Sequence, residues 1–199
     1  TLDGGELGEI SYATFSGDKA TVIIRGGAVH PGRDSDKLVD AHPLAEHILA
    51  LLPHGAQAPE KTDGREGYIY LASRENTPTA CKLHFSLRAF EDDELAEFGR
   101  VLESVCASVQ RIEPRACITC TITPEYRNIR DRLQHEMRPV AYAVDALKSL
   151  GITPLSPPVR GVTDGAHLTA LGVPTPNLFT GMQNIHSPLE WVSVQDMEK

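Results

Sequence analysis

The sequence predicts an α/β protein in which a ferredoxin-like α+β domain, with the element order βαββαβ, is inserted into a partial α/β layer. Two observations support this prediction. Strand-like and helix-like patterns follow one another in the order β-α-β-β-α-β between residues 18 and 123. After Pro124 helices alternate with short strands, which is typical of a parallel α/β layer. We therefore expect residues 11–124 to form the inserted domain, and residues 1–10 and 125–199 to form the other.

The first half of the inserted domain combines β-rich stretches with one helix. The stretches "EISYATF" and "KATVIIRG" alternate like strands, and the residues "SGDK" between them are typical of a turn. A helix is expected after Asp40 as its N-cap, because Pro43 is tolerated only in a first helical turn. Its apolar residues recur at helical spacing: Leu44, Ala45, Ile48, Leu49 and Leu52.

The second half of this domain is predicted from two strands, a helix and a last strand. The strands "YIYLASR" and "ACKLHFSLRAF" are joined by "ENTP", and a helix begins at the acidic residues "EDDE". "ACITCTITP" is the last strand. It contains Cys117 and Cys120, which are three positions apart and therefore point to opposite faces of a strand. We interpret both as small packed side chains rather than as a zinc or redox motif.

The remaining chain is predicted to alternate between helix and strand. A helix is expected from near Pro139 to Gly151, followed by a short helix in "DGAHLTAL" and a buried strand in "PTPNLFTG". The loop "MQNIHSPLEW" comes next, and "VSVQDMEK" begins a last helix. This order is consistent with part of a parallel α/β layer.

Composition excludes several classes of function. The chain has 199 residues, of which 41% are hydrophobic, and its net charge of −8 argues against nucleic acid or an anionic membrane as main partner. No apolar run approaches the length of a membrane span. The four cysteines are too few for a disulfide framework, so we expect a reducing, cytoplasmic location. Phosphate-loop, dinucleotide and G-x-S-x-G motifs are absent from the sequence.

Two residues are candidates for a site in the α/β layer. Asp3 follows a strand end and precedes two glycines, and His186 lies in the loop after the predicted strand "PNLFTG". Each residue alone is more often an ordinary surface side chain. Together they lie at the carboxyl ends of strands of one layer, which is where open α/β sheets hold their sites.

Further candidates are spread over both domains. Arg160 precedes a glycine and could bind a carboxylate with its guanidinium, whereas Asp164 is better interpreted as a helix cap. His30 follows a strand of the inserted domain, in a loop shaped by Pro31 and Gly32. Asn128 lies at the crossover between the domains, and Arg88 ends a strand as either a surface charge or a second anion contact.

These pieces carry a family resemblance. The stretches "TLDGGELGEI", "HPG", "LRAF", "YRN", "PVRGVTDGAHLTALGVPTPNLFTG" and "NIHSPLEWV" occur in this order along the whole chain. They resemble the peptidase T family, the tripeptide aminopeptidases among the zinc-dependent M20 metallopeptidases. The resemblance implies a catalytic α/β domain with two zinc ions and an inserted lid domain of the βαββαβ type. It also implies a short peptide as substrate and a possible homodimer through the lid.

The resemblance assigns a role to each matching residue. Asp3 and His186 match ligands of the two zinc ions, one for each ion. His30 matches the lid histidine that stabilises the developing oxyanion. Asn128 and Arg88 match polar contacts to the substrate, and Arg160 matches the arginine that holds its carboxylate.

Other motifs implied by the resemblance are absent from this sequence. None of the eight histidines is followed by x-Asp, and no Glu-Glu pair occurs. We therefore expect the chain to be the C-terminal half of such a peptidase and to be inactive alone, without its general base. The alternatives are an M20 dipeptidase or an N-acyl amino acid amidohydrolase, or a non-catalytic module for dimerisation or ligand sensing.

Overall fold

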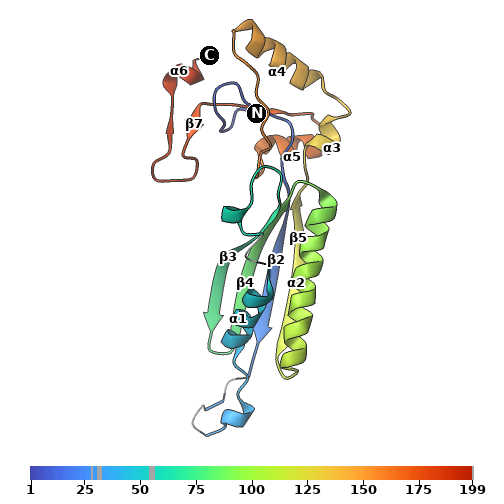
Figure 1. Cartoon of the computed structure of the whole chain (residues 1–199), viewed down its shortest axis with the longest axis vertical. Helices are drawn as coiled ribbons and strands as arrows, with labels where there is room; N and C mark the ends of the chain where they lie inside the picture. The colour runs from blue at the N-terminus through green and yellow to red at the C-terminus, as the bar shows by residue number, and fades with distance from the viewer. Residues whose placement is uncertain (28, 31–32, 54–56, 199) are drawn as a thin grey trace. The chain divides into compact units, whose positions relative to one another are not determined.

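The computed structural model of the chain describes residues 1–27, 29–30, 33–53 and 57–198 (Figure 1). The chain divides into two compact units. One unit consists of Thr1–Ser16 and Tyr126–Lys199, and we name it the terminal unit. The other consists of Gly17–Glu125, and we name it the inserted unit. Each unit is described by itself.

The inserted unit is built on a four-stranded sheet with the order β3-β4-β2-β5. The strands are β2 (Ser16–Arg25), β3 (Tyr68–Thr77), β4 (Ala80–Ala89) and β5 (Cys117–Tyr126). β3 and β4 form an antiparallel pair with an irregular register between Leu71 and Ser73. Every second residue of β4 is buried, so one face of the sheet is covered.

Two helices pack against β4 and against each other: α1 (Ala41–Leu51) and α2 (Asp92–Ile112) (Figure 1). Asp40 caps α1, because its carboxylate accepts a hydrogen bond from the His42 N–H at 2.9 Å. The first turn of α2 carries three acidic residues, which interact favourably with the positive end of the helix dipole. Short 3-10 helices, η1 (Ser35–Lys37) and η2 (Pro59–Lys61), lie in the connections. The predicted βαββαβ arrangement is confirmed.

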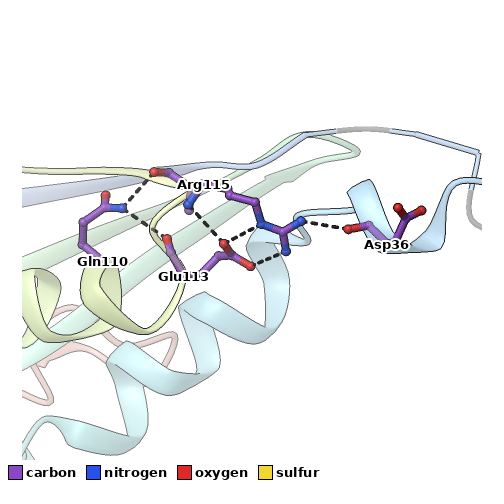
Figure 2. Close-up of polar contacts among 5 residues, drawn as sticks. Asp36, Gln110, Glu113 and Arg115 are labelled. Carbon is purple, nitrogen blue, oxygen red and sulfur yellow. Dashed lines mark hydrogen bonds and ion pairs between the residues drawn. The ribbon is translucent and has the colours of Figure 1, made fainter.

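A polar network closes the turn between α2 and β5 (Figure 2). The Gln110 side-chain amide donates to the carbonyls of Glu113 and Ala116, at 3.2 and 2.9 Å, and its oxygen accepts from Ile118 N–H at 2.8 Å. The Arg115 guanidinium donates two hydrogen bonds to the Glu113 carboxylate and a third, of 2.9 Å, to the Asp36 carbonyl. The network therefore joins the helix end, the last strand and η1.

The terminal unit is built from short strands and helices. Strand β1 (Ile10–Ser11) pairs antiparallel with β6 (Asn177–Leu178), and β7 (Met182–Gln183) pairs antiparallel with β8 (Trp191–Val192). The helices are α3 (Arg130–Leu133), α4 (Arg138–Ser149), α5 (Asp164–Ala170) and α6 (Val194–Met197). Ile10 packs with Val140 and Leu147 of α4, and Ile129 and Leu133 pack with Ala166 of α5.

Several local predictions differ from the structure. Residues 16–19, predicted as a turn, are the beginning of β2, and Ser16, Gly17 and Asp18 are buried there. Asp164 is the first residue of α5, and the N-cap is Thr163. The predicted buried strand in 174–181 is reduced to the two residues of β6. Cys117 and Cys120 lie on strand β5, as predicted, and Cys120 packs against the core. Cys117 is exposed, so the prediction that both are packed side chains is wrong for Cys117. Of the helices in the described ranges, none has both the length and the apolar character that crossing a bilayer requires.

Gln110 provides a direct test of the α2–β5 turn. We expect Gln110→Ala to lower the free energy of unfolding by about 1–3 kcal/mol, because it removes both donors and the acceptor of Ile118 N–H. Gln110→Glu should be at least as damaging, since a carboxylate oxygen would then face two carbonyl oxygens. Urea unfolding measures both effects. The exposed Ser104→Ala on the same helix serves as control. Wild-type stability of Gln110→Glu would contradict this account of the turn.

Candidate functional site

A cleft of about 550 Å³ opens in the terminal unit, and both Asp3 and His186 line it. Its wall comes from four segments of the chain. The lining residues are Asp3, Gly4, Gly5, Glu6, Glu9, Ser11, Pro157, Pro158, Val159, Val162, Thr163, Asn177, Met182, Gln183, Asn184, Ile185 and His186. The terminal unit therefore brings together the two residues that sequence analysis placed at strand ends of one layer.

Asp3 is positioned by backbone hydrogen bonds to the segment 177–181. Asp3 N–H donates to the Leu178 carbonyl at 3.1 Å, and Leu178 N–H donates to the Thr1 carbonyl at 2.9 Å. The two segments run parallel at the bridge between Leu2 and Leu178. The Asn177 side-chain amide also donates to the Asp3 carbonyl, at 2.5 Å. Because the backbone of Asp3 makes these contacts, its exposed side chain is available to the cleft.

His186 is positioned by the loop between β7 and β8. Its backbone φ is +64°, and Asn184 two residues earlier has a φ of +52°. The left-handed region is uncommon for residues other than glycine, and strain of this kind is found at functional sites. His186 N–H donates to the Glu190 carboxylate at 2.7 Å, which stabilises the loop. The loop follows directly on segment 177–181, so it continues at the edge where the turn after Asp3 lies.

The donor set of the cleft matches part of a metal centre. A carboxylate and an imidazole are both ligands that zinc takes, and a zinc centre uses three or four such ligands. Among the residues that the structure describes, no group of three or more His, Cys, Asp or Glu side chains is arranged to hold an ion. Within the part of the chain that the structure describes, Asp3 and His186 therefore do not form a complete metal centre.

Arg160 and Asn128 also belong to the terminal unit. The Arg160 guanidinium lies 5.4 Å from the centre of the Phe15 ring, and its neighbour Val159 lines the cleft. Asn128 is buried, and its side-chain oxygen accepts hydrogen bonds from the N–H groups of Thr14 and Arg130, both at 3.0 Å. Asn128 therefore joins the two chain segments of this unit, and the predicted substrate contact stays a prediction.

His30 and Arg88 belong to the inserted unit. His30 is exposed, and its carbonyl accepts hydrogen bonds from Arg33 and Asp34 N–H; the neighbouring Pro31 and Gly32 lie outside the described residues. Arg88 is largely buried: it donates to the Asp18 carbonyl at 3.1 Å and to the Glu125 carboxylate at 3.0 Å. Arg88 thus connects β4 with β2 and β5, and its predicted role as substrate contact stays a prediction, like that of His30.

Two polar residues of the cleft were not singled out from the sequence. Thr163 is only 7% exposed, and its hydroxyl has no hydrogen-bond partner among the described residues, although Thr163 is the N-cap of α5. A threonine at the N-cap normally accepts a hydrogen bond from the backbone of its own helix, and the Thr163 hydroxyl does not. Glu9 is the second residue. Burial raises the pKa of its carboxyl, and the Glu6 charge adds to this rise, whereas a hydrogen bond from the Glu6 backbone lowers it.

Comparison with known proteins gives the following matches. A family model described as "Peptidase dimerisation domain" matches residues 12–113. Peptidase T of Aeromonas salmonicida (strain A449) is 41% identical over 199 residues, which are 100% of this chain and 49% of that protein. The chain thus spans about half the length of the curated relatives it matches.

Two solved structures share the fold. The aminopeptidase PepT from Bacillus cereus ATCC 10987 superposes with a TM-score of 0.78 at 21% identity, over 99% of this chain and 52% of that one. The Bacillus subtilis protein YXEP, described as a dinuclear metal binding peptidase from the M20 family, superposes with a TM-score of 0.61 at 15% identity, over 99% and 52%. These TM-scores show a common fold.

The role of Asn128 can be measured. We expect Asn128→Ala to lower the free energy of unfolding by about 1–3 kcal/mol, because the buried N–H of Thr14 loses its acceptor. The partly buried N–H of Arg130 loses the same acceptor and should add less. The exposed neighbouring variant Arg127→Ala should stay within about 0.5 kcal/mol of the wild type. Chemical unfolding of both variants measures the difference. Equal stability of the two would show that the Asn128 oxygen does not hold these segments together.

Proposed function

The chain belongs to the M20 family of peptidases, and we propose that the whole protein to which it contributes is an aminopeptidase that releases N-terminal residues from short peptides. The observation that carries the proposal is the shared cleft of Asp3 and His186. Similarity to peptidase T over the full length of the chain supports the choice of a tripeptide aminopeptidase within the family.

We propose zinc as the metal, with two ions in each complete subunit. Asp3 and His186 would each supply one ligand to a different ion, and the other ligands and the general base would come from the part of the protein that this chain lacks. When bound, such a pair of ions supplies a nucleophilic water and polarises the scissile carbonyl. The likeness to a dinuclear M20 peptidase supports the metal, and the choice of zinc rests on the resemblance of the sequence.

The remaining residues are assigned by their chemistry. His30 would donate a hydrogen bond to the oxyanion that develops at the scissile carbonyl. Arg160 would pair with the C-terminal carboxylate of the peptide, and Asn128 and Arg88 would contact its polar groups. Because Arg88 already donates to Glu125, its contact with substrate would be shared with this carboxylate rather than replace it.

We propose that the predicted domain of residues 11–124, which in the structure corresponds to the inserted unit Gly17–Glu125, is the lid domain. We further propose that the protein is a homodimer through this lid. The match of residues 12–113 to a peptidase dimerisation domain supports this partner. The sheet of the inserted unit has two edge strands, β3 and β5, which offer backbone groups for pairing with a second copy. A cytoplasmic location, inferred from cysteine usage, stays part of the proposal.

The proposed activity is tested with the full-length protein in the presence of zinc. We expect turnover of tripeptides, and a loss of at least about 100-fold in kcat/KM for His186→Ala, because a metal ligand is removed. The exposed His167→Ala on α5 is the matched control and should keep its activity. Turnover of acylated amino acids alone would favour the amidohydrolase alternative. Absence of any turnover would favour a non-catalytic module.

Thr163 allows stability and activity to be separated. Its buried hydroxyl has no partner in the described structure, so Thr163→Val should leave the free energy of unfolding unchanged or increase it. If the hydroxyl binds the substrate, the same variant should lower kcat/KM by about 3- to 10-fold. Thr163→Ser keeps the hydroxyl and should retain activity. A thermal scan and peptide kinetics measure the two effects, and full activity of the valine variant would exclude the contact.

A further inference from the structure

The Asn177 side chain lies on the cleft wall and is hydrogen-bonded to the first residues of the chain. Asn177 belongs to β6, and the register of β6 with β1 pairs it with Ser11. Only 3% of Asn177 is exposed, although it lines the same cleft as Asp3. A buried amide side chain needs partners for its donors and its acceptor, because leaving them unbonded costs free energy.

These partners fix the direction in which the Asn177 amide points. Its side-chain nitrogen donates to the Asp3 carbonyl at 2.5 Å and to the Leu178 carbonyl at 3.4 Å. Its side-chain oxygen accepts from the Thr1 hydroxyl at 2.6 Å. Carbonyl oxygens can only accept, so the nitrogen of the amide must face them. The amide is therefore held between the side chain of Thr1 and the backbone of Asp3.

The Thr1 hydroxyl that donates to Asn177 is itself closely packed, beside Gly165 of α5. A Cβ atom on Gly165 would lie 3.2 Å from Thr1 Oγ1 and 2.5 Å from the Thr175 carbonyl oxygen, so a side chain there would require the backbone at Thr175 to shift. The Thr1 carbonyl also accepts from Leu178 N–H at 2.9 Å. The Asn177 amide is thus anchored on a well-packed part of the terminal unit.

We propose that Asn177 is a positioning residue: by bonding to the Thr1 hydroxyl and to the Asp3 carbonyl, it fixes the backbone from which the Asp3 carboxylate reaches the cleft. The consequence for metal binding rests on the proposed function of Asp3 as a zinc ligand. An alternative role for Asn177 is direct contact with the substrate. The structure favours positioning, because the amide is buried and both its nitrogen and its oxygen are bonded to groups of the protein.

Zinc titration of the full-length protein tests this role. Asn177→Ala removes all hydrogen bonds of the amide, so we expect zinc affinity to fall by about 10-fold or more at one ion and to stay within about 3-fold at the other. Gln110→Ala on α2 is the matched control, because its amide also donates to two carbonyls and accepts one hydrogen bond, but lies in the inserted unit. This variant should bind both ions like the wild type.

The other outcomes of the titration would overturn the proposal. An equal loss of affinity at both ions in Asn177→Ala would show a general structural effect, not the positioning of Asp3. Unchanged affinity at both ions would show that Asp3 does not depend on the amide. If KM for a tripeptide then increases while both zinc affinities stay unchanged, Asn177 contacts the substrate directly.

A second measurement does not depend on metal. Asp3 N–H is bonded to the Leu178 carbonyl, so its hydrogen exchange with solvent, followed by NMR in the full-length protein, reports how firmly the Asp3 backbone is held. Exchange should be faster in Asn177→Ala and unchanged in Gln110→Ala. Unchanged exchange in Asn177→Ala would overturn the proposal whatever the zinc affinity. If the wild type binds no zinc while exchange responds as expected, the proposed function fails and the positioning of Asp3 stands.

Discussion

The parallel pairing of residues 1–5 with residues 177–181 is the interaction on which the cleft depends. Its hydrogen bonds join the first residues of the chain to a segment near the other end. Because the two segments are parallel, both continue from the same end of the pairing. The turn after Asp3 and the loop with His186 therefore line the same cleft. Without this pairing, neither side chain would have a defined position relative to the other.

The pairing uses backbone groups and leaves side chains for the site. Asp3 donates its N–H to Leu178 and accepts from Asn177 at its carbonyl, while its carboxylate lies on the cleft side. Asn177 is itself bonded to the Thr1 hydroxyl. Buried amide side chains with several partners are rigid, because leaving any partner unbonded costs free energy. The wall of the cleft is thus set by backbone and amide groups that are hydrogen-bonded within the protein.

Periodicity and turn residues were sufficient to predict the inserted unit, since its strands and helices have clear apolar faces, as in the alternating burial of β4. The shared cleft of Asp3 and His186 also followed from strand-end positions. Thr163 and Glu9 were missed because burial of their side chains in the cleft sets them apart, and a local sequence pattern does not show this burial. The "SGDK" stretch was misread, because its turn-forming residues lie in a strand buried by tertiary contacts.

Three features of the cleft lower stability rather than increase it. His186 adopts a left-handed backbone, Thr163 buries a hydroxyl without a described partner, and Glu9 holds a partly buried carboxyl beside the Glu6 charge. If the sequence were selected for stability alone, such destabilising features would not be expected to lie together. All three residues line the same cleft as Asp3, and such a concentration is expected where residues are kept for binding and not for folding. The same cleft is therefore singled out by its energetics, independently of any resemblance.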